Sequence, residues 1–242
     1  MTFCLGASVD EGLLAISDTL ITSGREMITA RKLTTYQPKG GAMFVMTSGL
    51  RSVRDKALTY FENALADRDE PFDRLFEVVN LFAEQIRQVR REDRKWLTDG
   101  GLDFNTHALI GGQMRHDQTH KLYLVYPEGN WVEPSRATPY QVIGSTGYGK
   151  PILDRTLKAT DSLRHAFKVG CLSFDSTRIS AADVDFPIDV ALYRKDSFEL
   201  VEHRFDKDDL EPLSSLWQER IRSAIQDVPN EWDEKIFSKL DT

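Results

Sequence analysis

The strongest constraint on the fold is the way hydrophobic spacing changes along the chain. Apolar and β-branched residues alternate over Thr2–Val9 and Leu13–Ser17, and the turn signal Asp10-Glu11-Gly12 between them predicts a β-hairpin. A Pro-Lys-Gly-Gly turn separates two further strand candidates, Lys32–Tyr36 and Ala42–Thr47. The chain therefore opens with four consecutive antiparallel strands.

The spacing then becomes helical. Apolar residues recur every three or four positions over Val53–Ala64, where Ser52 is the expected N-cap. A second and stronger helix is predicted over Phe72–Val89, opened by Pro71. Two helices therefore follow the first strands.

A second group of strands and helices follows Gly100-Gly101. Predicted strands and helices come in the order strand Phe104–Gly111, strand Lys121–Tyr126, strand Tyr140–Ile143, helix Pro151–Leu157, helix Ser162–Phe174, strand Ile188–Tyr193 and strand Phe198–His203. Runs of strands that alternate with runs of helices favour an α+β fold over a doubly wound parallel sheet. We expect a four-layer αββα sandwich, with two stacked antiparallel sheets covered by helices on both outer faces.

An amphipathic helix is predicted at the end of the chain, over Leu210–Val228. We therefore expect a sandwich domain over residues 1–205 and a C-terminal helical extension over residues 206–242. The extension would pack on the domain or on a neighbouring subunit.

Composition excludes several classes of partner. The 242 residues carry 31 Lys and Arg against 38 Asp and Glu, a net charge of −7 that does not attract nucleic acid or anionic membranes. Two cysteines cannot build a disulfide framework, and no apolar run reaches the length of a membrane span. The first residues show no secretory leader, so we expect a cytoplasmic protein.

Thr2 is the residue with the most informative chemistry. If Met1 is removed, Thr2 carries a hydroxyl and a free α-amine on one residue. An α-amine has an ordinary pKa of about 7.7–8.0, so it can accept the hydroxyl proton near neutral pH. Thr2 also suits the plain role of the first residue in an edge strand.

Asp18 and Lys32 favour the chemical role. Asp18 follows the strand Leu13–Ser17, and Lys32 opens the next strand. A lysine close to the terminal amine lowers the pKa of that amine by charge repulsion, which keeps it a base. A buried lysine needs an anion, and Asp18 can supply it. An ordinary ion pair at a sheet edge is the alternative.

Several segments together resemble the proteasome-type N-terminal-nucleophile hydrolases. The similar segments are Thr2, the strand ending Leu-Leu-Ala-Ile-Ser-Asp at Asp18, the region of Lys32, Met46–Gly49 and Ile143–Ser145. The stretch from Ile110 to Gly129 is similar to a hairpin of proteasome β subunits. The resemblance covers Thr2 to about Tyr193. Length and the terminal helix resemble the bacterial Anbu (ancestral β-subunit) family more than the shorter HslV peptidase.

The resemblance implies a role for each matching residue. Thr2 matches the nucleophile, and Asp18 and Lys32 match the charged pair behind it. Gly49 matches the glycine whose N–H forms the oxyanion hole, and Ser145 matches the serine near the terminal amine. Asp185 is the candidate for a further acid of the site, with Asp175 and Asp183 as competitors.

Two departures from the family pattern concern the site. The interval from Thr2 to Lys32 is two residues shorter than in the proteasome pattern. The family's Ser-Gly step after the acid is replaced by Phe-Pro-Ile, which begins at Phe186.

The resemblance implies a threonine peptidase that hydrolyses peptide or other amide bonds without a cofactor or metal. It also implies self-assembly into a ring or an open helical stack, with a peptide or protein substrate and an unidentified ATPase or adaptor as a further partner. A catalytically silent proteasome-like subunit that binds partners is the alternative.

Two other motifs suggest different chemistry. Gly144–Lys150 fits the spacing of a phosphate-binding loop, but Pro151 stands where the loop needs Ser or Thr, so an NTPase is the weaker interpretation. His116 and His120 have the spacing of a zinc motif, but a polar hairpin tip does not place them on one helix face. We expect a solvated turn there.

Overall fold

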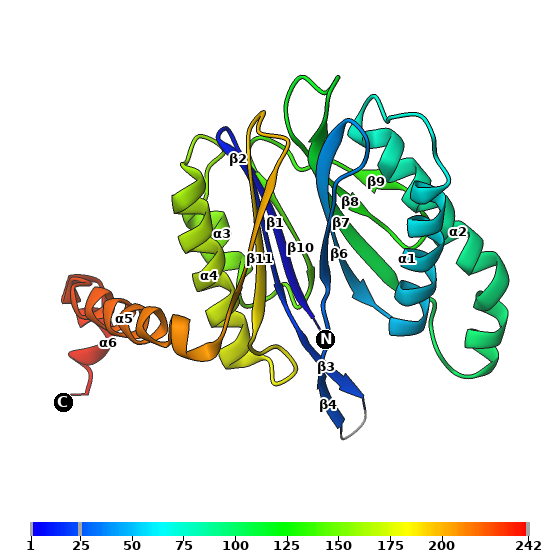
Figure 1. Cartoon of the computed structure of the whole chain (residues 1–242). Helices are drawn as coiled ribbons and strands as arrows, with labels where there is room; N and C mark the ends of the chain where they lie inside the picture. The colour runs from blue at the N-terminus through cyan, green and yellow to red at the C-terminus, as the bar shows by residue number, and fades with distance from the viewer. Residues whose placement is uncertain (1, 24–25, 241–242) are drawn as a thin grey trace. The chain divides into compact units, whose positions relative to one another are not determined.

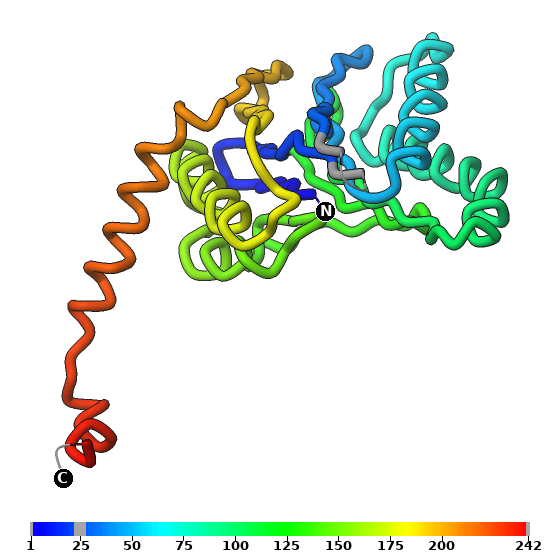
Figure 2. The backbone as a smooth tube through the Cα atoms, turned by 90° about the horizontal axis from the view of Figure 1, so that it is seen from below, coloured from blue at the N-terminus to red at the C-terminus, as the bar shows by residue number. Residues whose placement is uncertain are grey.

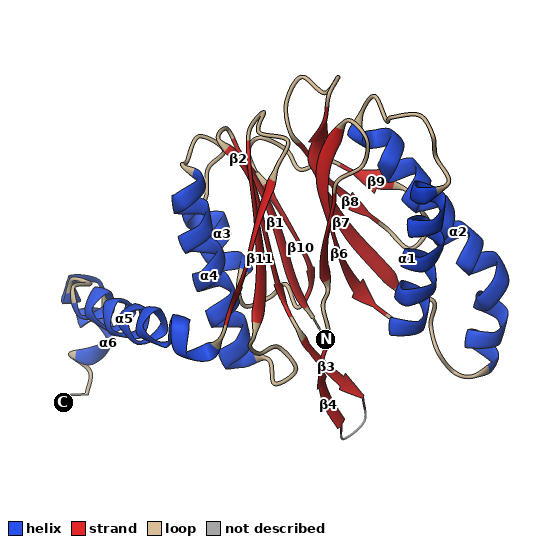
Figure 3. Cartoon of the chain, viewed as in Figure 1, coloured by secondary structure: helices blue, strands red, loops and turns tan. Residues whose placement is uncertain are grey.

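The computed structural model of the chain describes residues 2–23 and 26–240. Two five-stranded antiparallel sheets stack face to face, with a pair of helices on each outer face (Figures 1 and 3). The predicted α+β, four-layer αββα sandwich is therefore confirmed. By compactness the chain divides into two units between Asp206 and Lys207, and each is described by itself below.

The first sheet holds both ends of the sandwich unit. Its strand order is β10-β1-β2-β11-β12, with β1 Phe3–Val9, β2 Gly12–Asp18, β10 Tyr140–Gly144, β11 Ile188–Arg194 and β12 Leu200–Phe205. The expected β1–β2 hairpin is present, with Cys4 opposite Ser17. Because β1 lies between β10 and β2, the start of the chain is an inner strand rather than an edge strand.

The second sheet is a simple meander. Its order is β5-β6-β7-β8-β9, with β5 Leu33–Tyr36, β6 Gly41–Gly49, β7 Thr106–Met114, β8 Lys121–Val125 and β9 Trp131–Val132. The Tyr140–Ile143 strand follows the β7–β8 hairpin in the sequence but does not join this sheet. It pairs instead with β1 in the first sheet, which brings Gly144 opposite Phe3.

One hairpin has no counterpart among the expected elements. β3, Leu20–Ser23, pairs with β4, Glu26–Thr29, as a separate two-stranded sheet. This hairpin links β2 to β5 and accounts for the chain between Asp18 and Lys32 (Figure 1). Its strands hold equal numbers of apolar and polar residues that do not alternate, so the sequence held little signal for them.

Helices α1, Arg51–Ala66, and α2, Leu75–Asp99, cover the second sheet. The expectations for their first residues are wrong. α1 has Leu50 as its N-cap, without a side-chain cap, because the chain enters the helix directly from β6. α2 begins after Arg74 rather than at Pro71, and the Leu75 N–H donates to Asp117 at 2.9 Å.

Helices α3, Lys150–Thr156, and α4, Leu163–Ser180, cover the first sheet. Ser162 is the N-cap of α4, and its hydroxyl accepts the N–H of His165 at 3.1 Å. The observed α4 runs six residues beyond the expected end at Phe174. Gly170 lies on its buried face, where an added Cβ would stand 2.7 Å from Ile16.

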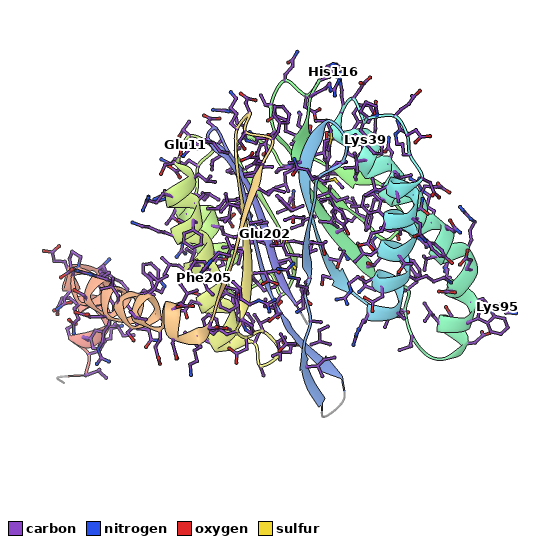
Figure 4. The ribbon with its side chains drawn as sticks, in the orientation of Figure 1. Glu11, Lys39, Lys95, His116, Glu202 and Phe205 are labelled. Atoms are coloured by element: carbon purple, nitrogen blue, oxygen red, sulfur yellow. The ribbon has the colours of Figure 1, made fainter. Side chains whose placement is uncertain are left out.

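Two hydrophobic clusters hold the layers together. One joins α1 and α2 to the second sheet through residues such as Phe61, Phe82 and Ile110. The other lies between the sheets and includes Leu13, Phe44 and Leu109. The tube in Figure 2, seen from below, and the ribbon in Figure 4 show the same layering within the first unit. Packing on both faces makes the sheets a rigid support for any group fixed at their ends.

The second unit consists of α5, Lys207–Gln226, a short 3-10 helix at Asn230–Trp232, and α6, Glu234–Phe237. It carries a series of exposed apolar side chains: Leu216, Ile221, Ile225, Val228, Trp232, Ile236, Phe237 and Leu240. Within the described part of the chain, every helix is too short or too polar to cross a membrane.

Candidate active site

A cavity of about 450 Å³ opens at the end of the sandwich where β1 begins. Both sheets contribute to it, since it is lined by Thr2 before β1, by Thr47, Ser48 and Gly49 of β6, and by His107 of β7. Lys32 and the first turn of α1 complete its wall. Three of the six predicted site residues, Thr2, Lys32 and Gly49, therefore line one cavity.

Thr2 is held by the backbone of the strand that neighbours it. Only 8% of Thr2 is exposed, and its carbonyl accepts the N–H of Ser145 at 2.6 Å. Gly144 permits this approach: its φ is +91°, and an added Cβ would stand 1.9 Å from the Thr2 oxygen. A side chain at position 144 would therefore displace Thr2. The loop after β10 thus brings Ser145, a fourth predicted residue, next to Thr2.

Asp18 and Lys32 form a fully buried ion pair. The Lys32 ammonium donates to both carboxylate oxygens of Asp18 at 2.8 Å and to the Leu20 carbonyl at 2.6 Å. Asp18 Oδ1 also accepts the N–H of Phe3 at 2.8 Å. The two side chains are 0% and 2% exposed. One carboxylate therefore ties the lysine to the backbone beside Thr2.

Burial has the largest effect on the pKa of the Asp18 carboxyl group. It raises the pKa of Asp18 to about 6, while the Lys32 charge and the hydrogen bonds from Lys32 and Phe3 act in the opposite direction. At neutral pH Asp18 is ionised and anchors the ammonium. Burial also raises the pKa of the nearby Cys4 thiol far above its ordinary value, which keeps that thiol protonated.

Gly49 ends β6 in a conformation that other residues rarely adopt. Its φ is +121°, and an added Cβ would stand 2.3 Å from the carbonyl oxygen of Asn105. The position therefore requires glycine, which leaves its backbone at the cavity wall without a side chain. A carbonyl group of a bound amide can approach the backbone at such a point.

Three features of the cavity were missed by the sequence analysis. The Arg51 and Arg54 side chains line it, although α1 was expected only as an amphipathic helix. The buried Thr47 lines it as well, and its hydroxyl has no hydrogen-bond partner among the described residues. The signal was the presence of two arginines within five positions after the segment Met46–Gly49.

Asp185 is not among the residues that line the cavity. It is exposed in the loop between α4 and β11, where its Oδ1 accepts the N–H of Phe186 at 2.8 Å. Asp175 is buried on α4 and pairs with Arg178 at 2.8 Å, and Asp183 is half-buried in the same loop as Asp185. A role for Asp185, or for either competitor, stays a prediction.

The two competing motifs fold in ways that do not suit their proposed chemistry. Lys150 binds Asp154 through both carboxylate oxygens at 2.8 Å, and the strand before the loop, β10, is antiparallel to its neighbour. His116 and His120 do not converge, because His116 contacts Asp73 and His120 contacts the Val9 carbonyl. Within residues 2–23 and 26–240, no group of three or more His, Cys, Asp or Glu side chains could hold a metal.

The expectation of a fully solvated turn at these histidines is wrong for His120. Its side chain is buried, and its Nε2 lies 2.8 Å from the Val9 carbonyl. The hairpin tip folds back against the end of β1, while His116 remains at its exposed end (Figure 4).

The αββα sandwich, with Thr2 at the head of an inner strand and a buried Asp–Lys pair beside it, defines a proteasome-like subunit with the N-terminal-nucleophile hydrolase fold. A search of protein-family models gave no match, and a search of curated proteins gave none either. Solved structures give strong matches.

Each of three Anbu structures matches the chain with a TM-score of 0.86. An Anbu mutant from Hyphomicrobium sp. strain MC1 is 29% identical, over 95% of this chain and 98% of that one. Anbu (ancestral beta-subunit) from Yersinia bercovieri is 29% identical, over 94% and 97%. The Anbu complex from Pseudomonas aeruginosa, described as a helical assembly, is 27% identical, over 94% and 97%. The chain is therefore similar to Anbu proteins in both fold and sequence, over nearly its whole length.

Proposed function

We propose that this protein is a threonine hydrolase that cleaves peptide or other amide bonds with Thr2 as its nucleophile, after removal of Met1. The observation that carries the proposal is the buried Asp18–Lys32 pair, whose lysine lines the same cavity as the buried Thr2. Burying two charges costs free energy that well-packed apolar residues would not cost. A role in positioning a charge beside a nucleophile explains why the chain keeps them there.

The first chemical step is attack by the Thr2 hydroxyl on the amide carbonyl carbon. The hydroxyl proton passes to the α-amine of Thr2, directly or through one water, and a C–O bond forms. Lys32 favours the unprotonated amine and stabilises the negative charge that develops on the oxygen. The backbone N–H at Gly49 receives the carbonyl oxygen as it becomes an oxyanion.

The second step releases the products. The C–N bond breaks, the leaving amine takes the proton from the Thr2 amine, and an ester to Thr2 remains. Water then attacks the ester, with the same amine as its proton acceptor. The ester C–O bond breaks, the Thr2 oxygen takes that proton from the amine, and the free acid leaves. Ser145 is proposed to orient this amine, because its backbone holds the Thr2 carbonyl at 2.6 Å.

We also propose that the protein forms homo-oligomers. The family member from Pseudomonas aeruginosa is described as a helical assembly. The second unit of this chain exposes large apolar residues, among them Trp232, Phe237 and Leu240, which favour burial against another copy. Light scattering coupled to size-exclusion chromatography tests this, and a monomer at micromolar concentration would contradict it.

A covalent probe tests the proposed chemistry most directly. A peptide epoxyketone reacts with both the hydroxyl and the α-amine of a terminal threonine, so peptide mapping should find the adduct on Thr2. The Thr2→Ala variant should lose labelling and at least about 10³-fold of any amidase rate, as expected for loss of a nucleophile. Thr2→Ser, which keeps the hydroxyl, is the matched control and should be labelled.

The same experiment distinguishes the silent-subunit alternative. Intact-mass spectrometry first establishes whether Met1 is absent from the sample. A folded protein that lacks Met1 and remains unlabelled would contradict the proposed function and favour a binding role.

A further inference from the structure

The cavity beside Thr2 has a strongly asymmetric charge. Lys32, Arg51 and Arg54 line it, whereas none of its described lining residues is acidic. The chain as a whole carries a net charge of −7, so a cationic cavity is not a consequence of average composition. Because the Lys32 ammonium donates its hydrogen bonds to Asp18 and Leu20, the cationic donors left for a ligand side chain belong to the two arginines.

The two guanidinium groups share a single carboxylate. Arg54 Nε donates to Asp55 Oδ1 at 2.8 Å, and Arg51 Nε donates to Asp55 Oδ2 at 3.2 Å. Each guanidinium carries five N–H donors, so one carboxylate leaves several of them unused. Arg54 is also largely buried, with 11% of its side chain exposed, whereas Arg51 is 55% exposed. A buried cation with unused donors favours an anionic partner over water.

A third group at the cavity wall has an unused hydrogen bond. The Thr47 side chain is 2% exposed, and no described residue is a partner for its hydroxyl. A hydroxyl can donate to a carboxylate oxygen. Thr47 lies two residues before Gly49 on β6, where successive side chains alternate between faces, so it shares a face with the glycine at the cavity wall.

We propose that this cavity selects substrates with an acidic side chain, Glu or Asp, on the residue whose carbonyl group Thr2 attacks. The inference rests on the proposed function. That side chain branches from the atom next to the attacked carbonyl carbon, so it enters the space that adjoins Thr2 and Gly49. There its carboxylate meets the Arg54 guanidinium, with Arg51 at the outer rim and the Thr47 hydroxyl as a further donor.

A set of fluorogenic peptides that differ only at this residue tests the proposal. Glu and Gln have nearly the same shape and differ in charge, and Leu and Lys complete the set. We expect kcat/KM for Glu to exceed that for Gln by about tenfold to a hundredfold at low salt, the range for a hydrogen bond to a charged group. The ratio should fall as ionic strength rises, because the rim is exposed.

Variants of the arginines show which residue causes the preference for Glu over Gln. Arg54→Gln should bring the Glu/Gln ratio close to one, and Arg51→Gln should lower it by a smaller factor. Asp55→Asn removes the competing carboxylate, so it should raise the ratio. Arg136→Gln is the matched control, since Arg136 forms a two-pronged pair with Asp10 at a separate site. It should leave the ratio unchanged.

The outcomes separate this inference from the proposed function. If a Leu epoxyketone labels Thr2 but Glu and Gln peptides are cleaved equally, the acidic preference is wrong and the threonine hydrolase stands. If neither a Leu nor a Glu epoxyketone labels Thr2 in the Met1-free protein, the proposed function fails. If Arg54→Gln unfolds, the Glu/Gln ratio of Arg51→Gln and Asp55→Asn still decides, because their expected shifts have opposite signs.

Discussion

Two lysine–aspartate pairs in this molecule have the same contact geometry in opposite surroundings. Lys32 and Asp18 meet through both carboxylate oxygens at 2.8 Å, and so do Lys150 and Asp154 on α3. The first pair is 2% and 0% exposed, and the second is 50% and 46% exposed. The two pairs therefore have the same contact distances and differ in burial.

The carboxyl groups of the two pairs respond in opposite directions. The hydrogen bond from Lys150 lowers the pKa of Asp154, and the Tyr140 hydroxyl bonded to it acts in the same direction. Burial raises the pKa of Asp18 to about 6 despite the equivalent contact with Lys32. Water solvates the exposed pair in every state, whereas the buried pair depends on its partners alone. The buried pair is therefore the one whose loss should affect both folding and activity.

The largest expected effect is that of removing the buried lysine. Lys32→Met leaves Asp18 without its cation, so we expect unfolding to become easier by about 3–5 kcal/mol and hydrolysis to be lost. Urea unfolding followed by circular dichroism measures the first, and epoxyketone labelling the second. The double variant Lys32→Met with Asp18→Leu should recover stability but not activity. Recovery of both would separate the pair from the chemistry.

Two glycines, Gly49 at the cavity wall and Gly147 in the loop before α3, extend the comparison. Gly49→Ala places a Cβ against Asn105 at a φ of +121°, so we expect a loss of about 1–3 kcal/mol in stability. If its N–H serves the oxyanion, the rate should also fall by about 10²–10³. Gly147, in the loop before α3, has open space around a Cβ, and Gly147→Ala should change stability by less than about 1 kcal/mol. Thermal unfolding and peptide hydrolysis measure both variants, and equal effects would contradict the prediction.

The pH dependence of activity and of stability should distinguish Asp18 from Asp154. Below pH of about 6 Asp18 becomes protonated and releases Lys32, so kcat/KM should fall about an extra tenfold for each pH unit below that value. The stability of the fold should instead increase as pH falls. The pKa of Asp18 is higher in the folded state than in the unfolded state, so Asp18 favours folding most at low pH. This contribution is lost as pH rises through about 6.

Asp154→Asn is the control for this profile and should leave it unchanged. Activity that stays constant between pH 5 and 7, measured with the protein shown to be folded, would contradict the assignment of Asp18.

The smallest expected effect belongs to the exposed pair. Lys150→Met should lower stability by about 0.2–1 kcal/mol, the usual range for exposed ion pairs, and should not impair labelling of Thr2. A loss as large as that of Lys32→Met would show that contact geometry, rather than burial, decides the strength of these pairs.

Local signals in the sequence were sufficient to find several of the residues that are proposed to act in chemistry. Alternation and the turn at Asp10 located β1 and β2, and with them Thr2 and Asp18. The position of Lys32 at the start of the next strand marked it as the partner of Asp18, and the family resemblance then added Gly49. These features depend on a few residues each and on short-range geometry.

Other features depend on contacts between distant parts of the chain. The pairing of β10 with β1 rather than with the second sheet places Ser145 beside Thr2, and no local pattern encodes the choice of sheet. The burial of His120 against Val9 likewise joins residues more than a hundred positions apart. Ser52 is a good N-cap residue by type, but the direct entry from β6 moves the start of α1 to Leu50.

The buried position of Thr2 on an inner strand has a practical consequence for anyone who produces this protein. Thr2 lines the cavity and directly precedes β1, so we expect a tag or leader fused ahead of it to compete with a ligand for that space. Such a fusion would act as a tethered inhibitor even if the rest of the molecule folded normally. Purification handles therefore belong after Thr242, and an inactive preparation carrying extra residues at its start does not test the proposed function.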